Sequence, residues 1–157
     1  MTAPLALLDS NVIVAGVAAE HDDHLLSVAL FERFPIKSFA VAAHSFAESY
    51  VTLTKRGPRA PFGWDAQDAW TALEAVANAT QLVGLSPAAG LDGVRLYASQ
   101  GNIGARIYDW LLGQSAVLAR VPAIVTWNVG HMMGLFPALA VQTPEEFASR
   151  QQPPTLS

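Results

Sequence analysis

The sequence contains no cysteine. Disulfide bonds, zinc-thiolate sites and thiol catalysis are therefore excluded. Charged residues are also scarce, at 14% of 157 positions, and the net charge of −4 argues against a protein that wraps nucleic acid through charge alone. So small a charged fraction predicts that part of the surface is covered by a partner or by a second copy of the chain.

Long apolar runs are also missing. None approaches the roughly 18 residues that a membrane span requires, so we expect no membrane association. The first apolar run follows no basic segment, and Pro4 and Asp9 interrupt and end it, which argues against a signal peptide. The expected location is the cytoplasm.

Apolar residues nevertheless make up 52% of the chain, with a mean hydropathy of +0.29. A chain of this length and composition can bury a substantial core. We expect a single domain over residues 1–150. The last residues, 151–157, have the composition of a disordered chain end.

The stretch from 5 to 16 is the most informative. A short apolar run ends at Asp9, the polar pair Ser10 and Asn11 follows, and apolar spacing resumes at Val12. This pattern predicts a buried strand that leads directly into a helix. In an open parallel sheet ligands bind beyond the carboxyl ends of the strands, so Asp9 is placed to take part in chemistry. The simpler alternative is that Asp9 only caps the helix.

Short apolar segments alternate with helical patterns along the rest of the chain. Further strands are expected at 38–42, 81–85, 123–127 and 139–141. Helices are expected at 11–17, 25–34, 43–56 and 64–80, from Pro87 onward, at 105–120, and after a capping box that begins at Thr143. The alternation predicts an α/β sandwich with a parallel sheet. The helices at 43–56 and 64–80 should form a hairpin, and their Tyr and Trp content makes them the candidate partner-covered surface.

Three acidic side chains stand out by their position at a strand end or early in a helix: Asp9, Glu48 and Asp109. The two helical acids also have ordinary structural explanations. Glu48 completes a capping box with Ser45. Asp109 can pair with Arg106 three residues earlier, although Gly113 and other small residues on its helical face would leave room for a metal and a phosphate.

Five segments occur in an order and spacing that match one family. They are LLDSNV at 7–12, SFAESYVTLTK at 45–55, GARIYDWLL at 104–112, IVTWNVGHM at 124–132 and TPEEF at 143–147. Through them the chain resembles PIN domains, and more narrowly the VapC-type ribonuclease toxins of bacterial toxin–antitoxin pairs. The resemblance implies a three-layer α/β/α sandwich around a five-stranded parallel sheet. It also implies an RNA substrate, a cognate antitoxin partner and a homodimer.

The same resemblance implies roles for individual residues. Asp9 and Asp109 become the main metal ligands, and Glu48 completes the ligand set or orients the attacking water. The family often has a fourth acid where this chain has Asn128, which can hold a water but carries no charge, so metal should bind more weakly. Residues expected to orient these groups or the substrate are Ser10, Asn11, Thr126, His131 and Arg106. Cations suited to flanking phosphates are Arg106 again, with Lys55, Arg56 and Arg59.

Clustered carboxylates without Cys, and without a His pair at ligand spacing, select Mg²⁺ or Mn²⁺ rather than Zn²⁺. The reaction that the resemblance implies is hydrolysis of RNA phosphodiester bonds by a metal-activated water. Asn128 and the low charge content motivate an alternative, a PIN-fold binding module with weak or no catalysis.

A third possibility is phosphotransfer on Asp9. A haloacid-dehalogenase-like phosphatase needs a second Asp two residues later, where this chain has Asn11. A receiver domain needs a Lys at a later strand end, and the only lysines are Lys37 and Lys55. Both versions therefore fit the sequence less well.

Overall fold

The computed structural model describes residues 2–151. A single five-stranded sheet lies at its centre, all parallel, in the order β3-β2-β1-β4-β5. The strands are β1 (Ala6–Leu8), β2 (Phe39–Ala42), β3 (Gln81–Val83), β4 (Ala123–Val125) and β5 (Ala140–Gln142). The helices are α1 (Ser10–Val17), α2 (His24–Arg33), α3 (Ala43–Thr54), α4 (Ala66–Ala79), α5 (Pro87–Ser99), α6 (Ile107–Leu118), α7 (Val129–Met132) and α8 (Pro144–Arg150). The predicted α/β sandwich with a parallel sheet is confirmed.

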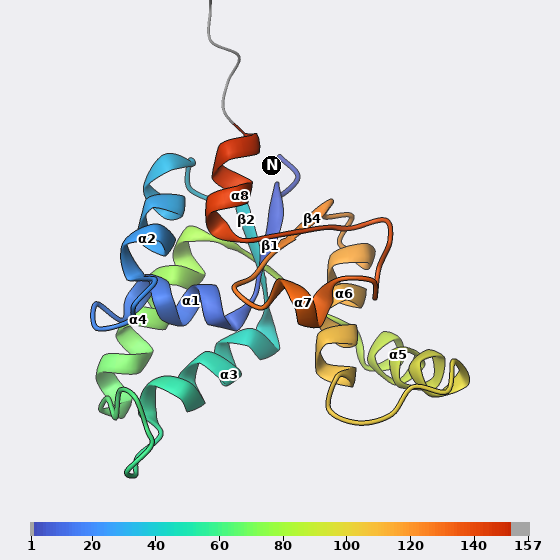
Figure 1. The fold of residues 1–157 in the computed structure, drawn as a ribbon, viewed down its shortest axis with the longest axis horizontal. Helices are drawn as coiled ribbons and strands as arrows, with labels where there is room; N and C mark the ends of the chain where they lie inside the picture. The colour runs from blue at the N-terminus through green and yellow to red at the C-terminus, as the bar shows by residue number, and fades with distance from the viewer. Residues whose placement is uncertain (1, 152–157) are drawn as a thin grey trace, which may run out of the picture.

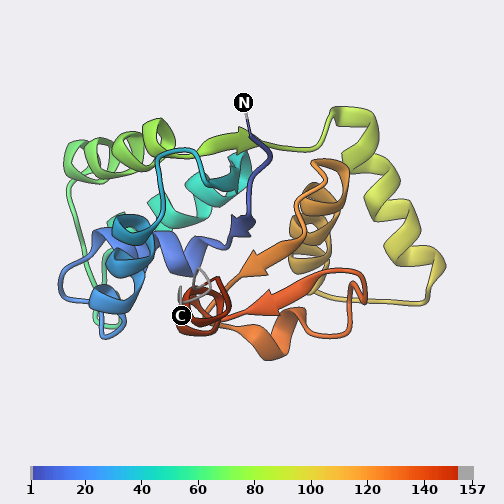
Figure 2. The same ribbon diagram turned by 90° about the horizontal axis from the view of Figure 1, so that it is seen from above.

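Helices cover both faces of the sheet (Figure 1). One core cluster joins the sheet to α1, α2, α3, α4 and α8, and a second joins the opposite face to α6 and α7. Figure 2 shows α5 on the outer side of α6, away from the strands. Alternate residues of β1 face opposite layers, with Ala6 and Leu8 in the first cluster and Leu7 in the second. The fold is therefore the expected three-layer arrangement.

Several helix starts follow the sequence signals. Asp9 caps α1 and its side chain accepts from the backbone N–H of Ser10, while Ser86 caps α5 with Pro87 in the first turn. Thr143 and Glu146 form the predicted capping box at α8. These polar caps satisfy backbone N–H groups that have no partner inside the helix.

The capping box predicted at Ser45 and Glu48 is wrong. Strand β2 runs straight into α3, so the helix starts at Ala43 and its N-cap is Ala42, which has no side-chain acceptor. Ser45 therefore lies inside the first turn, where its hydroxyl is buried and has no hydrogen-bond partner among the described residues. Glu48 is consequently free of a capping role.

The inner face of α3 also differs from the prediction. The helical spacing of Phe46, Tyr50 and Leu53 in the sequence predicts that they share one stripe of this helix, but the buried residues are Ser45, Ser49 and Leu53. Phe46 packs against the core only in part, and the Tyr50 side chain lies at the surface. Small hydroxyl residues allow α3 to approach the core closely, and the Ser49 hydroxyl donates to the carbonyl of Ser45 at 2.7 Å.

Helix α4 packs beside α3 as the predicted hairpin, with the Trp64 N–H donating to the Leu53 carbonyl at 2.8 Å. Its buried residues are Ala69, Leu73 and Val76. Trp70, expected on this inner face, is instead 52% exposed. The aromatic ring therefore contributes to the outer surface of the hairpin.

Two further sequence-based expectations concern the chain as a whole. Within residues 2–151, no helix is both long and apolar enough to span a membrane. Most of the predicted disordered tail, residues 152–157, lies outside the described part of the chain. Helix α7 is short and was not predicted, because its four residues form too brief a pattern to detect.

Gly113 on α6 has no room for a side chain. A Cβ placed there would lie 2.0 Å from a ring carbon of Phe136, whose ring stacks on Trp110 with centroids 4.7 Å apart. We predict that Gly113→Ala destabilises the fold by about 1–3 kcal/mol, because the ring must move out of a packed site. Urea unfolding measures this.

The matched control is Gly130→Ala on α7, where a new Cβ meets nothing within 4 Å. That substitution should leave stability almost unchanged. Equal effects of the two substitutions would contradict the packing argument.

Candidate active site

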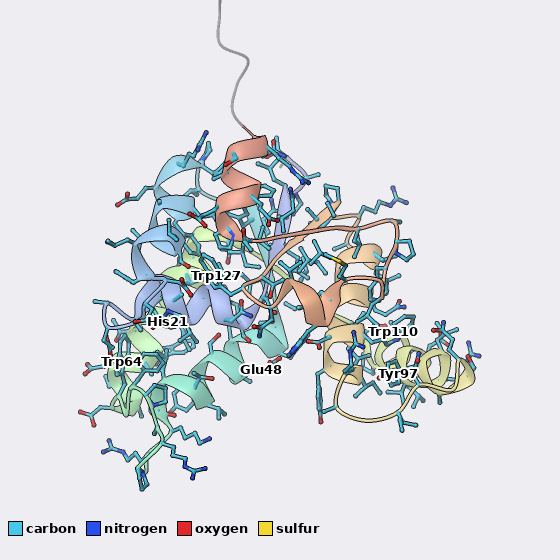
Figure 3. The ribbon with its side chains drawn as sticks, viewed as in Figure 1. His21, Glu48, Trp64, Tyr97, Trp110 and Trp127 are labelled. Carbon is cyan, nitrogen blue, oxygen red and sulfur yellow. The ribbon has the colours of Figure 1, made fainter. Side chains whose placement is uncertain are left out.

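The candidate site lies where the central strands β1 and β4 end. Asp9 follows β1, Thr126 follows β4, and the two strands are hydrogen-bonded neighbours. Parallel pairing brings their carboxyl ends to the same edge of the sheet, which is where open α/β folds bind ligands. Glu48 reaches this edge from α3, near the centre of Figure 3.

Protein donors hold both oxygens of Asp9. Its Oδ1 accepts from the backbone N–H of Ser10 at 2.7 Å, and its Oδ2 accepts from the hydroxyl of Thr126 at 2.8 Å. The side-chain amide of Asn11 adds a longer contact to Oδ2 at 3.4 Å. The carboxylate is therefore fixed from two separate parts of the chain.

Asn11 and Thr126 also bind one another. The Asn11 amide donates to Thr126 Oγ1 at 3.1 Å, and its carbonyl oxygen accepts from the backbone N–H of Trp127 at 3.0 Å. Thr126 is fully buried. The predicted orienting residues Asn11 and Thr126 are thus placed behind Asp9, and they link the end of β1 to the end of β4.

Ser10 connects Asp9 to Glu48. Its hydroxyl lies 3.5 Å from both Asp9 Oδ1 and Glu48 Oε2, so it can donate to either carboxylate. On the other side of Glu48, the Nε2 atom of His44 is 3.6 Å from Oε1. Glu48 is therefore placed between a hydroxyl and an imidazole, with about half of its side chain exposed.

Asp109 approaches the same edge from α6. The predicted ion pair with Arg106 is not formed, because the Arg106 guanidinium donates to the backbone carbonyl of His131 at 2.7 Å. Burial and Asp9 raise the pKa of Asp109, and the nearby His131 and Arg106 oppose this rise only in part. The hydrogen bond from Arg106 to the His131 carbonyl links the start of α6 to α7 next to the Asp109 carboxylate.

The three carboxylates influence one another. Burial raises the pKa of Glu48, and the negative charge of Asp9 raises it further, with a smaller contribution from Asp109. Burial and the charge of Asp9 likewise raise the pKa of Asp109. Like charges that disfavour one another's ionisation are a feature of candidate functional sites.

The carboxylates do not form a closed ligand set. Among residues 2–151, no group of three or more His, Asp or Glu side chains is close enough to hold a metal ion by itself. The donors are nevertheless all oxygens, and Mg²⁺ commonly binds one or two carboxylates and keeps several waters. The donor set therefore fits a hydrated Mg²⁺ or Mn²⁺ ion in its chemistry.

Asn128 is exposed and occupies the N-cap position of α7 without a capping hydrogen bond from its side chain. Its backbone N–H donates to Thr126 Oγ1 at 3.0 Å. The residue lies beside the cluster and contributes no charge to it. The room that small residues were expected to leave around Asp109 is not found at Gly113, where the Phe136 ring fills the space. That expectation was wrong because a helical face alone does not show what packs on it.

His44 was missed by the sequence reasoning. It lies one helical turn before Glu48 on α3, and the i, i+4 spacing of a His and a Glu is the signal that could have found it. Burial lowers the pKa of His44, and the charge of Asp9 opposes that effect. The neutral imidazole can exchange a proton near the carboxylates.

Two cavities flank the carboxylates. One, of about 600 Å³, is mostly apolar and is lined by residues that include His44, Glu48 and Tyr108. The other, of about 450 Å³, is lined by residues that include Ser10 and Asn11. An extended ligand whose middle lies at the carboxylates therefore has room on both sides.

Of the predicted phosphate-binding cations, Arg106 lies near Asp109, whereas the other three lie apart from the carboxylates. Lys55 follows the end of α3, and Arg56 and Arg59 are exposed in the loop between α3 and α4. Arg56 pairs with Asp65 at 3.0 Å. These three cations are therefore placed to contact a long ligand at the far end of α3. They do not lie beside Asp9.

The sequence matches no protein-family model and no curated protein sequence. Solved structures are similar in fold. PAE2754 from Pyrobaculum aerophilum has a TM-score of 0.63 at 16% identity, covering 95% of this chain and 96% of that one. The sarcin-ricin loop cleaving toxin VapC20 from Mycobacterium tuberculosis has a TM-score of 0.59 at 11% identity, covering 76% and 86%.

A third similar structure is VapBC2 from Rickettsia felis, bound to a DNA fragment from its promoter. Its TM-score is 0.58 at 15% identity, and the match covers 88% of this chain and 97% of that chain. The chain therefore has the PIN-like fold of the VapC toxins, as its sequence segments predicted. At these identities the comparison establishes the fold.

The raised pKa of Glu48 makes a stability prediction. At pH 7 in EDTA, Glu48→Gln should raise the free energy of unfolding by about 0.5 kcal/mol, a small value because the half-exposed carboxylate is screened by solvent. The native state disfavours the ionised carboxylate, so the gain should vanish below the unfolded-state pKa, where both states are protonated. Urea unfolding at pH 7 and pH 4 measures both values.

Glu74→Gln, at an exposed position on α4, is the matched control and should change stability little at either pH. A loss of stability in Glu48→Gln at pH 7 would show that Glu48 is held favourably and would contradict the electrostatic description.

Proposed function

We propose that this protein is a metal-dependent ribonuclease that hydrolyses RNA phosphodiester bonds, and that it is the toxin of a toxin–antitoxin pair. The observation that carries the proposal is the rigid placement of Asp9 between Glu48 and Asp109 at the carboxyl ends of β1 and β4. Two protein donors fix Asp9 at 2.7 and 2.8 Å, and its charge raises the pKa of both neighbours. The VapC-like fold supports the same function.

Asp9, Glu48 and Asp109 would hold the Mg²⁺ or Mn²⁺ ion, in part through water. When bound, the metal lowers the pKa of a water and stabilises the charge that develops on the phosphate oxygens. Glu48, with Ser10 and His44 on either side, is placed to orient that water and accept its proton. Asn128 would contribute a water contact without charge.

The remaining residues position these groups. Thr126 and Asn11 hold Asp9 in one orientation. Arg106 and His131 lie beside Asp109, where Arg106 can also face a substrate phosphate. Lys55 and Arg59 at the far end of α3 would bind phosphates several nucleotides away.

Metal binding and RNA cleavage test the proposal together. Calorimetry with Mn²⁺ should show binding to the wild-type chain and little to Asp9→Asn, a substitution that retains shape and helix capping. Even changes behind a metal ligand cost about 10- to 100-fold, so RNA cleavage by Asp9→Asn should fall by at least that factor. Removing the metal with EDTA should abolish wild-type cleavage.

Asp68→Asn on the exposed side of α4 is the control and should bind metal and cleave RNA as the wild type does. A wild-type chain that binds no metal at millimolar concentration and leaves RNA intact would replace the proposal with the alternative of a PIN-fold binding module, in which Asn128 marks lost catalysis.

Thr126→Val tests the positioning of Asp9. The substitution retains the shape of the buried side chain but removes the hydroxyl that donates to Asp9 Oδ2. We expect kcat for RNA cleavage to fall by about 10- to 100-fold, because the reacting groups lose their alignment. KM should change little, because the contacts that bind the RNA remain.

Thr71→Val, at an exposed position on α4, is its control and should leave both constants unchanged. A change confined to KM would instead show that Thr126 contacts the substrate.

An antitoxin partner is part of the proposal. The fold shared with VapC20 and VapBC2 supports it, because the resemblance of the sequence segments to VapC-type toxins implies a cognate antitoxin. Trp70 and Val51 on the α3–α4 hairpin are exposed, as expected of a surface that a partner covers. The cytoplasmic location remains a prediction.

A homodimer is also proposed. Exposed apolar side chains are numerous on α5 and α6, which lie on one side of the sheet in Figure 2, with α5 outside α6. They are Leu91, Val94, Tyr108, Val117 and Leu118. A second copy that covered them would account for the low charged fraction of the chain.

A further inference from the structure

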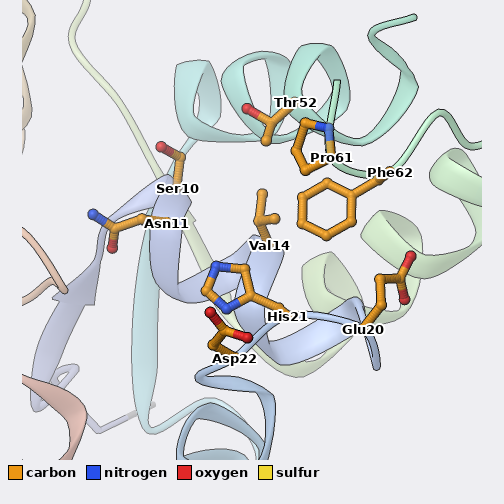
Figure 4. A pocket seen from close by; sticks show the side chains of 9 residues that line it. All are labelled: Ser10, Asn11, Val14, Glu20, His21, Asp22, Thr52, Pro61 and Phe62. Carbon is orange, nitrogen blue, oxygen red and sulfur yellow. The ribbon is translucent and has the colours of Figure 1, made fainter. Parts of the chain in front are cut away.

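The 450 Å³ cavity beside the carboxylates is shown in Figure 4. It lies between α1, the turn after α1, α3 and the loop that precedes α4. Ser10 and Asn11 form one end of it and also contact Asp9. Thr52 lines it from α3, one turn beyond Glu48, and its hydroxyl donates to the Glu48 carbonyl at 3.1 Å. The cavity is therefore continuous with the candidate active site.

Two aromatic rings lie close together and nearly parallel in this cavity. The rings of His21 and Phe62 are inclined by only 16°, with centroids 6.1 Å apart. Figure 4 shows both rings on the wall of the cavity, with the Val14 side chain next to them. Flat aromatic surfaces of this kind stack on planar ligands, and nucleobases stack on them whatever their sequence.

The His21 ring has a defined hydrogen-bonding direction. The backbone N–H of Asp23 donates to its Nδ1 atom at 3.0 Å, so Nδ1 is the acceptor and the neutral ring carries its proton on Nε2. The ring is thus held by its own turn and offers one N–H donor. A loop that fixes a ring in this way loses little entropy when a ligand stacks on it.

The charges at the cavity exclude a phosphate. Its charged lining residues are Glu20 and Asp22, both acidic. The indole N–H of Trp64 donates to Glu20 at 2.8 Å and lowers the pKa of Glu20, so this side chain remains ionised. An uncharged base fits where a phosphate would be repelled. The Asp22 carboxylate, beside the His21 ring in Figure 4, can accept from an exocyclic amino group.

We propose that this cavity binds one nucleobase of a single-stranded RNA, next to the phosphodiester held at Asp9, by stacking it on His21 and Phe62. The inference rests on the proposed ribonuclease function and adds a subsite to it. Continuity with the carboxylates favours a nucleotide of the substrate over a segment of a protein partner. Adenine, cytosine and guanine carry the amino group that Asp22 can bind, and uracil does not.

Fluorescence anisotropy with a labelled single-stranded RNA octamer of mixed sequence tests the subsite, with the full chain in Ca²⁺, an oxygen-binding cation that replaces Mg²⁺ or Mn²⁺ at the carboxylates while the strand stays intact. Phe62→Leu retains an apolar contact with the core but removes the ring, and it should weaken binding by about tenfold. His21→Asn retains an acceptor for the Asp23 N–H and should weaken binding similarly. Phe62→Tyr should restore binding to within about twofold, since the phenol ring still stacks.

Two controls separate base stacking from other contacts. Trp70→Leu removes an exposed aromatic ring on α4 and should leave the affinity unchanged. An octamer with abasic sugars should bind wild type and Phe62→Leu equally weakly. A tenfold loss that persists with the abasic strand would overturn the assignment of a base and indicate that Phe62 supports the backbone path or a polypeptide.

The wild type provides the remaining outcomes. Suppose that the wild type cleaves RNA with Mn²⁺ and that Phe62→Leu binds the normal octamer as tightly as the wild type does. This result would overturn the subsite and leave the ribonuclease proposal intact. Wild-type chain that neither binds nor cleaves RNA would overturn both.

Discussion

The site depends on one constraint, the fixed orientation of the Asp9 carboxylate. Both of its oxygens accept hydrogen bonds from protein groups, one at the start of α1 and one from Thr126 after β4. The carboxylate therefore cannot turn away from Glu48 and Asp109, whose ionisation it disfavours. A cation bound at these carboxylates would relieve their repulsion. The packed core on both faces of the sheet supplies the stability that this repulsion opposes.

Topology explains how so few residues create this constraint. Asp9 and Thr126 are 117 positions apart in the sequence, yet β1 and β4 are adjacent and parallel, so both strand ends deliver a side chain to one edge. The central place of β1 in the sheet puts β2 on its other side, and β2 continues directly into α3, which carries Glu48. No loop separates β2 from α3, so the helix begins at Ala43, directly after the strand. Glu48 therefore lies in the second turn of the helix, where its Oε2 is 3.5 Å from the Ser10 hydroxyl.

Sequence reasoning succeeded where the signal is local and failed where it depends on packing. The strand end at Asp9 and the capping box at Thr143 are signatures within a few residues, and both were found. Ser45 carries the same local signature, but continuous backbone from β2 overrides it. Gly113 looked like open space and instead accommodates the Phe136 ring, a contact between residues 23 positions apart that no helical pattern reveals. The acids of the site were all predicted, whereas His44 was not, because its link to Glu48 is a single ordinary i, i+4 pair.

A chain with a net charge of −4 and an acidic site faces a general difficulty if its ligand is a polyanion. Long-range attraction cannot supply the affinity, as it does for basic nucleic-acid-binding proteins. For such a ligand the attraction must therefore be local. A metal would supply it at Asp9, Arg106 would supply it beside the reacting phosphate, and contacts with uncharged parts of the strand would supply it elsewhere. The rings of His21 and Phe62 are suited to this last role, because base stacking needs no positive charge and tolerates the acidic wall formed by Asp22. In the proposed arrangement, affinity that comes from base stacking would depend less on salt than phosphate contacts do, and any preference among bases would come from Asp22, because stacking tolerates every base.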